Sequence, residues 1–261
     1  MTPCFGRIML SKPKEVSPAV LVLARCLTLL QTKIIFSEYL FCYCQKDFDM
    51  DARNNLKIIH TVDGAILQNR YGKAVIRSHD IGLISLPTGE IVMADPTLRF
   101  EIADFKRKAF QQKVSPGIYP VFAYSAHAGE DRTLAFAEIR FTDQPPVTFT
   151  AAKTICDAEQ SSRRNCGYVV NESTTGLMDG RFFRESCMRS NSFELDYETA
   201  LDELLEENLE RWGINCAAGI APNGDYSAAL FTVPSGVYYW YWGKGQKGEI
   251  CCLTADFFTY L

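Results

Sequence analysis

The stretch Val233–Ile250, VPSGVYYWYWGKGQKGEI, places five consecutive aromatic residues ahead of a short charged segment with three glycines. Successive side chains of a β-strand point to opposite faces, so Tyr238, Trp240 and Trp242 would share one face and the two tyrosines between them the other. The glycines that follow would suit a turn at the end of this strand. Aromatic residues on both faces are typical of a buried strand, which we expect here, or of a strand with one exposed binding face. The three residues of the first face are therefore candidate binding residues.

Further β-strands are predicted on both sides of this aromatic strand. Asp225–Val233 and Glu249–Phe258 read as strands, and so do Val114–Ser125 and Leu134–Thr142, with a polar loop between the last two. From Leu56 onward, short apolar runs are separated by Asp-Gly, Tyr-Gly and Thr-Gly pairs, which indicates a β-meander. Within it, residues 83–86 and 90–94 are predicted to pair as a hairpin closed by the turn Pro87-Thr88-Gly89.

The clearest helix is predicted over Glu194–Trp212, with leucines along one face and Gly213 as its stop. Its other face carries acidic residues, which usually are solvated but would also suit a basic partner; the candidates are Glu198, Asp202, Glu206 and Glu210. Residues 1–50 are predicted to form a helical extension. The fold class predicted for residues 51–261 is a single α+β domain, built on a mainly antiparallel β-sheet with flanking helices.

Composition narrows the classes of partner. The chain has 261 residues and a formal net charge of −4, which argues against a nucleic-acid partner because such proteins carry basic patches. No uninterrupted apolar run of ~18 residues is present, so neither a membrane-spanning helix nor a membrane partner is expected. The ten cysteines contain no C-x-x-C pair. They are interpreted as reduced thiols, and the predicted location is the cytoplasm.

No established catalytic motif is recognised. None of the three histidines lies in H-E-x-x-H or H-x-H, so neither a multi-histidine metal site nor a cofactor is expected. His127, in the predicted polar loop, is the best exposed candidate, whereas His60 is interpreted as a core residue of an apolar strand. Asp95, Asp179 and Asp256 are candidate catalytic carboxylates, although aspartates before proline or glycine more often serve turns. Catalysis by a cysteine and a histidine would depend on proximity in space.

Several stretches occur together in an order that resembles one bacterial protein family. They are LPTGEIVMADP, VSPGIYPV, LAFAEIRFTDQPP, TTGLMD and the final PSG, YWYWG and GEICCLTADF segments. The chain resembles the DUF4241 family of unknown function over roughly residues 80–258. The resemblance implies that the aromatic run is a strand leading into a hairpin.

Two motifs depart from this family's pattern. A Gly-Asp-Gly step is absent after Ser235-Gly236, while Asn171 stands in place of an aspartate and Ser173 in place of a glycine. The departures remove negative charge that a metal ion or a general base would use.

Two classes of function are expected from these observations. The first is a non-enzymatic interaction protein, such as an immunity or defence factor that binds a protein partner, for example a basic toxin. It predicts that the candidate carboxylates lie apart in turns. The alternative is a hydrolase-type enzyme, which predicts that Asp95, Asp179 and Asp256 cluster in one pocket.

Overall fold

The computed structural model describes residues 52–60, 62, 64–69, 72–94, 101–159, 168–170, 174–188, 195–221 and 227–258. The predicted helical extension over residues 1–50 lies outside the described residues, and so does the candidate Asp95. No helix among the described residues has both the length and the apolar character needed to span a membrane.

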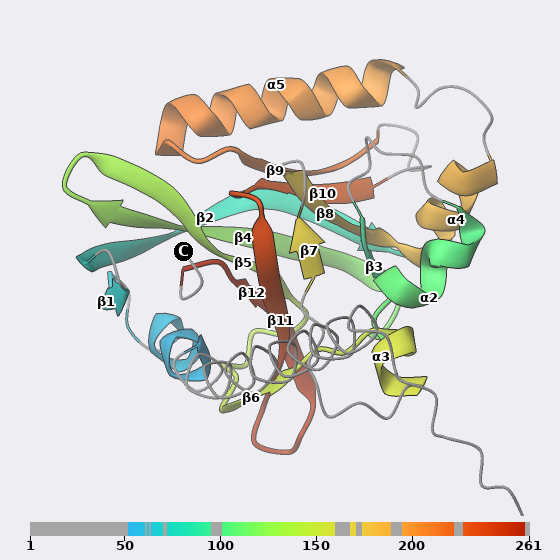
Figure 1. The fold of residues 1–261 in the computed structure, drawn as a ribbon, viewed down its shortest axis with the longest axis horizontal. Coiled ribbons are helices and arrows are strands. Elements are labelled where there is room, and N and C mark those ends of the chain that lie inside the picture. The colour runs from blue at the N-terminus through green and yellow to red at the C-terminus, as the bar shows by residue number, and fades with distance from the viewer. Residues whose placement is uncertain are drawn as a thin grey trace, which may run out of the picture. The chain divides into compact units, whose positions relative to one another are not determined.

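Twelve strands in the described part of the chain form one sheet, which is flanked by one long helix and several short ones (Figure 1). The strands are β1 (Ile66–Asn69), β2 (Gly72–Leu86), β3 (Ile91–Met93), β4 (Gly117–Ala128), β5 (Asp131–Arg140), β6 (Thr148–Ala151), β7 (Tyr168–Val170), β8 (Thr174–Asp179), β9 (Cys216–Ile220), β10 (Ser227–Thr232), β11 (Gly236–Lys244) and β12 (Ile250–Asp256). The helical elements are residues 52–59, η1 (Ile102–Asp104), α2 (Phe105–Lys108), α3 (Ile155–Glu159), α4 (Gly180–Met188) and α5 (Leu195–Trp212).

The strand order is β3-β8-β10-β9-β2-β4-β5-β12-β11-β6, with β1 added to β2 and β7 to β11. Every pairing is antiparallel except that of β2 with β9. A short segment links the two ends of this order: Phe110 N donates to Ile91 O beside β3, and Gln111 N donates to Lys153 O after β6, both at 2.9 Å. The two ends of the strand order are therefore joined through this segment, and the predicted α+β class with a mainly antiparallel sheet is confirmed.

Each face of the sheet has its own apolar core. The main core lies on the inner face and contains Tyr238, Trp240 and Trp242, all buried. The second core lies on the opposite face, where the helix over residues 52–59 packs Leu56 against the central strands and where Tyr241 is also buried. The aromatic run is thus buried on both of its faces. This confirms the expected buried strand. Tyr238, Trp240 and Trp242 do not form an exposed binding face, so that interpretation is wrong.

Three local predictions need correction. Residues 57–59 are helical rather than extended. The turn at Pro87–Gly89 forms, since Gly89 has φ +68° and its N–H donates to Leu86 O at 3.2 Å, but the predicted hairpin does not. Instead, β3 leaves β2 and pairs with the distant β8, a long-range contact that local pattern does not reveal. The predicted polar loop after Ser125 is mostly strand, because β4 continues to Ala128.

The predicted long helix is confirmed as α5, which lies along β9 and β10 (Figure 1). Leu204 and Leu205 pack on an apolar cluster from these two strands, and Asn208 Nδ2 donates to Cys216 O at 2.8 Å. Gly213 ends the helix with φ +73°, and its N–H donates to Leu209 O at 2.8 Å. A positive φ of this kind suits glycine, which has no Cβ.

Candidate functional site

Asp179 serves the local structure at the end of β8. Its carboxylate accepts hydrogen bonds from the Thr88 backbone N–H at 2.9 Å and from the Thr88 hydroxyl at 2.8 Å. It also accepts from the Arg181 backbone N–H at 2.7 Å, at the first turn of α4. The carboxylate therefore ties the turn after β2 to the start of a helix, which is the ordinary capping role of an aspartate.

Asp256 is buried at the end of β12, opposite Phe136 on one neighbouring strand and Tyr239 on the other. In the strand order, β12 is separated from the β8 strand that carries Asp179 by β10, β9, β2, β4 and β5. The structure therefore does not bring these two candidates together in the described part of the chain. Asp95 lies outside it.

His127 lies on β4 in a small polar cluster. Its Nε2 is 2.8 Å from the buried Ser125 hydroxyl, which also lies 2.7 Å from Nε2 of His79. The His79 ring stacks on Trp212 of α5 with a centroid separation of 4.8 Å. Burial is the main cause that lowers the pKa of both histidines, with added repulsion from nearby arginines, and the pKa of His79 falls to about 4.

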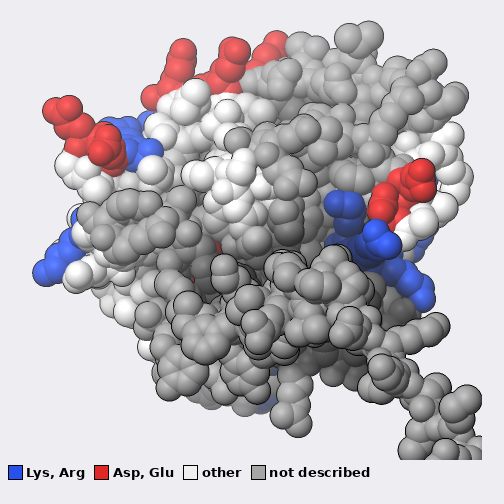
Figure 2. Space-filling view, viewed as in Figure 1, with Lys and Arg blue, Asp and Glu red and all other residues white. Residues whose placement is uncertain are grey.

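The structure describes the side chains of two of the four acidic candidates on α5. Glu206 and Glu210 are exposed on α5, together with Glu203 and Glu207. Figure 2 shows acidic side chains along the upper edge of the molecule, where α5 lies in Figure 1. The side chains of Glu198 and Asp202 lie outside the described residues. The described part of this helix face is therefore solvated and negatively charged.

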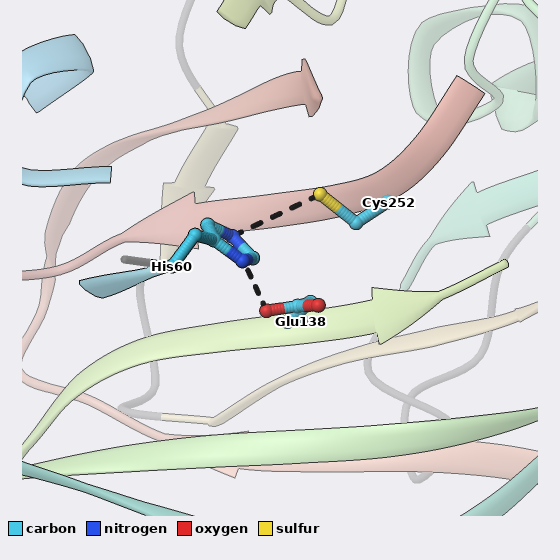
Figure 3. A group of neighbouring side chains, drawn as sticks. All are labelled: His60, Glu138 and Cys252. Carbon is cyan, nitrogen blue, oxygen red and sulfur yellow. Dashed lines mark hydrogen bonds and ion pairs between the residues drawn. The ribbon is translucent and has the colours of Figure 1, made fainter. Parts of the chain in front are cut away.

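A polar pocket of about 360 Å³ opens on the face of the sheet opposite the main core. Its wall includes His60, Glu138 and Cys252, which come from three separate parts of the chain (Figure 3). Tyr124 and Arg140 also line it. The sequence prediction named none of these five residues as a catalytic or binding candidate.

Strand register explains why Glu138 and Cys252 are neighbours. Cys252 of β12 pairs with Arg140 of β5, and Thr254 pairs with Glu138, so the glutamate and the cysteine are diagonal partners on the same face. A bulge between Tyr124 and the next residue of β4 shifts the register there, and Tyr124 belongs to the second core on this same face. The sheet thus gathers polar groups from three adjacent strands.

His60 reaches the pocket from the helix over residues 52–59. Leu56 of that helix is fully buried in the second core, which holds the end of the helix against the sheet. The His60 imidazole stacks on Phe149 with ring centroids 5.5 Å apart. Its side chain is only 6% exposed. Packing therefore places the ring between the Glu138 and Cys252 side chains (Figure 3).

Glu138 is the centre of the hydrogen-bond network, and its side chain is fully buried. Oε2 accepts from the Tyr124 hydroxyl at 2.5 Å and lies 3.4 Å from Nε2 of His60. Oε1 accepts from Nε of Arg140 at 2.9 Å. The Arg140 guanidinium lies 4.0 Å from the Phe122 ring centroid, and its side chain stays 34% exposed toward the pocket. The buried carboxylate therefore has a charged partner and a neutral donor.

The surroundings set the protonation of the other groups. Burial lowers the pKa of His60, although the Glu138 charge opposes this. Burial, with help from Glu138, raises the pKa of the Cys252 thiol far above its ordinary value and raises the pKa of Tyr124 well above its own. Burial would lower the pKa of Arg140, but the Glu138 carboxylate outweighs it and the pKa rises. The pocket thus contains a neutral imidazole and a protonated thiol at neutral pH.

One sequence signal could have pointed to this site. Glu138 interrupts the apolar strand LAFAEIRF, and a charged residue in a buried strand is rare unless it is paired. His60 and Cys252 gave no such signal, because nothing in the sequence shows that they meet in space. His60 was also assigned to a strand.

Comparison with known proteins gives one match. The family model described as "Protein of unknown function (DUF4241)" matches residues 84–255, which include Glu138 and Cys252 but not His60. Neither the curated proteins nor the solved structures contain a match. Because the matched segment covers more than half of the sequence, the chain belongs to the DUF4241 family.

Proposed function

We propose that this protein is a hydrolase-type enzyme whose site is the pocket around Glu138. One observation carries the proposal: a buried carboxylate, an imidazole and a thiol from distant parts of the chain converge beside a pocket of about 360 Å³. Buried ion pairs add little stability compared with apolar packing. A polar group of this kind, next to a pocket, is therefore a candidate site for chemistry rather than for stability.

Attack by the Cys252 thiol is the less favoured mechanism. In a Cys-His-acid triad, one ring nitrogen faces the thiol and the other faces the acid. Here Nε2 of His60 is the atom nearest both Cys252 Sγ, at 3.9 Å, and Glu138 Oε2, at 3.4 Å. The imidazole is thus not placed to relay a proton between them. Activation of a water molecule beside Glu138 and His60 fits the arrangement better.

The pocket wall indicates the class of substrate. The exposed part of the Arg140 side chain lines the pocket together with Gln144, Pro145 and Pro146. A guanidinium recognises planar anionic groups such as carboxylates and phosphates. We therefore propose a small polar substrate with an anionic group that contacts Arg140 while the bond to be hydrolysed faces Glu138.

The test is a substrate panel applied to the purified full-length chain. Chromogenic carboxylic esters, phosphate monoesters, phosphodiesters and peptide amides are compared for wild type and Glu138→Gln. Loss of the water-activating carboxylate is expected to lower kcat/KM by about 10²–10⁴-fold. His127→Asn, which alters a histidine of the separate cluster on β4, is the matched control and keeps wild-type turnover. Absence of turnover with every class, or full activity of Glu138→Gln, would refute the proposal.

The exposed acidic face of α5 favours a second candidate function, the binding of a basic protein partner such as a toxin. Glu203, Glu206, Glu207 and Glu210 are all exposed on this helix. Acidic surfaces steer basic proteins into contact through long-range attraction. The test is recovery of a stoichiometric partner with tagged full-length protein. The Glu206→Lys/Glu210→Lys variant is expected to lose it, whereas Glu130→Lys, on the exposed turn after β4, retains it. Equal recovery by both variants would exclude this surface.

A cytoplasmic location is part of the same proposal. Four cysteines in the described part of the chain are free thiols: Cys187, Cys216, Cys251 and Cys252. Free thiols of this number are typical of a reducing compartment. Fractionation of the source cells, followed by detection of the native protein, tests the location.

A further inference from the structure

We infer that His60, Glu138 and Cys252 form a binding site for one zinc ion. The inference rests on and deepens the proposed function, because an ion held by Glu138 and His60 would activate the water molecule beside them, but it is tested by binding alone. Each residue offers one ligand atom, and the three atoms lie within 4.8 Å of one another. Figure 3 shows the imidazole, the carboxylate and the thiol turned toward one another.

The spacing of the three atoms fits an ion better than it fits direct hydrogen bonds. His60 Nε2 lies 3.4 Å from Glu138 Oε2 and 3.9 Å from Cys252 Sγ. A strong charge-assisted N–H···O bond would be about 2.7–2.9 Å long. Ligand atoms ~2.0–2.3 Å from a tetrahedral zinc ion lie roughly 3.3–3.7 Å apart. The nitrogen–oxygen pair already has this spacing, whereas Cys252 Sγ, at 3.9 Å from the nitrogen, would have to move closer to the other two atoms when an ion binds.

The groups around the ligands hold them in orientation. Arg140 and Tyr124 donate to the two oxygens of Glu138, and the Thr254 hydroxyl donates to Cys252 Sγ at 3.4 Å. Partners of this kind fix the direction of ligating side chains in metal sites. One lone pair of Glu138 Oε2 remains for the ion after the Tyr124 bond, because a carboxylate oxygen has two.

The ligand types select the metal. A thiolate, an imidazole and a carboxylate are all common zinc ligands, whereas magnesium and calcium take oxygen ligands. Three protein ligands with a fourth position open to solvent are the arrangement of catalytic zinc sites. Here the adjoining pocket provides the open side. On binding, the Cys252 thiol releases its proton to solvent, and the zinc–thiolate bond replaces the S–H bond.

The sequence did not predict a metal site, because it contains no closely spaced ligand pair such as C-x-x-C or H-x-H. These three ligands lie at positions 60, 138 and 252, and strand pairing and helix packing bring them together. The inference therefore depends on the folded arrangement. The family model does not predict it either, because His60 precedes the matched segment.

The experiment is a titration of the chelator-treated, reduced full-length protein with Co²⁺, followed by competition with Zn²⁺. We expect one high-affinity Co²⁺ per chain, with a thiolate-to-cobalt charge-transfer band and the visible bands of a tetrahedral ion, all removed by Zn²⁺. Cys252→Ala is expected to abolish the charge-transfer band, and His60→Ala to weaken binding by at least 100-fold. Tyr124→Phe, which alters only a supporting contact, is expected to weaken binding by about 10-fold.

Cys216→Ala is the matched control, since it removes a buried thiol from the main core and leaves the pocket intact. It is expected to keep the band, which also separates this site from cysteines elsewhere in the chain. No high-affinity binding by a folded wild type, or a band that survives Cys252→Ala, would overturn the inference. Metal binding without turnover would refute the proposed hydrolase and leave the zinc site standing. Glu138-dependent turnover by a protein that shows no high-affinity metal binding would refute the zinc site and leave the hydrolase standing.

Discussion

β5 and β12 lie side by side and present two faces of opposite character. Toward the main core they bury apolar side chains, which are Leu134, Ala137, Ile139, Leu253 and Ala255. The other face of the same strands carries Glu138, Arg140, Cys252 and Thr254. Because side chains alternate along a strand, one backbone supports both faces without conflict.

The contrast between the two faces indicates which side chains stabilise the fold and which are candidates for chemistry. The inner face is close-packed, and any loss of volume there is expected to lower stability. On the polar face each buried group depends on a specific partner, because an unpaired buried polar group is costly. Apolar residues would serve stability there at least as well. The polar face is therefore the better place to look for function.

The largest expected effect is the loss of a large side chain from the inner face. Trp240 is 2% exposed, and its ring contacts Phe110, Phe231 and Phe257. Trp240→Ala is expected to lower the free energy of unfolding by about 3–5 kcal/mol, because it removes buried area and leaves a cavity. Urea unfolding followed by circular dichroism measures the change. Val237→Ala, at an exposed position of the same strand, should change it by under ~0.5 kcal/mol. Similar values for the two variants would contradict a buried aromatic run.

A smaller effect is expected from the polar face. Glu138→Leu, measured with metals chelated, should lower the free energy of unfolding by about 1–3 kcal/mol, because Tyr124 and Arg140 lose their acceptor. Arg140 is partly exposed, so water replaces part of its loss. Adding Tyr124→Phe should cost less in this background than in wild type, since the unpaired hydroxyl is then removed. Simple additivity of the two changes would mean that the groups do not act as a network.

Much of the fold could be predicted where the signal is local. α5 and the strands β4 and β5 follow from periodicity, the β11–β12 hairpin follows from the family resemblance, and all of them form. The pairing of β3 with β8 could not be predicted, because it joins segments about 85 residues apart and competes with an equally plausible hairpin. The sequence does contain a signal for the helix over residues 52–59. Ala52, Leu56 and Ile59 recur at helical spacing, but the run KIIH was interpreted with a period of two.

The candidate site was harder to predict than the fold. The candidate aspartates were chosen because they stand beside glycine or proline or near a strand end, and Asp179 proves to cap a turn and a helix. Glu138 had the stronger physical signal, since a charge inside an apolar strand requires a partner. That partner set depends on strand register and on a β-bulge, neither of which is visible in one sequence.

Lowering the pH should affect stability through a third region, the polar cluster of His79, Ser125 and His127. The pKa of His79 is about 4 in the folded protein, against an ordinary value of 6.5, mainly because of burial and then because of His127, Arg77, Arg132 and Arg211. Between pH 6.5 and 4 the unfolded chain therefore binds a proton that the folded chain does not. The contribution of His79 to the free energy of unfolding should therefore fall as the pH drops through this window and level off below it.

His79→Gln is the variant that tests this assignment. It should reduce the proton uptake on unfolding near pH 5 by up to about one proton, seen as a shallower dependence of the urea midpoint on pH. His127 and His60 also have lowered pKa values, so some slope remains. The same pH dependence in variant and wild type would show that His79 titrates normally.

The smallest effect is expected from a change that keeps an aromatic ring on the inner face. Trp240 Nε1 is buried and has no hydrogen-bond partner among the described residues. Trp240→Phe gives up apolar area, but it also removes an N–H group that loses its bond to water on folding, a cost of about 1–3 kcal/mol. The two terms oppose each other, so the free energy of unfolding should stay within about 1.5 kcal/mol of wild type, far from the alanine value. A cost equal to that of Trp240→Ala would show that the indole N–H is bonded in solution. The inner face would then hold a polar contact of its own, and its contrast with the Glu138 face would be one of degree.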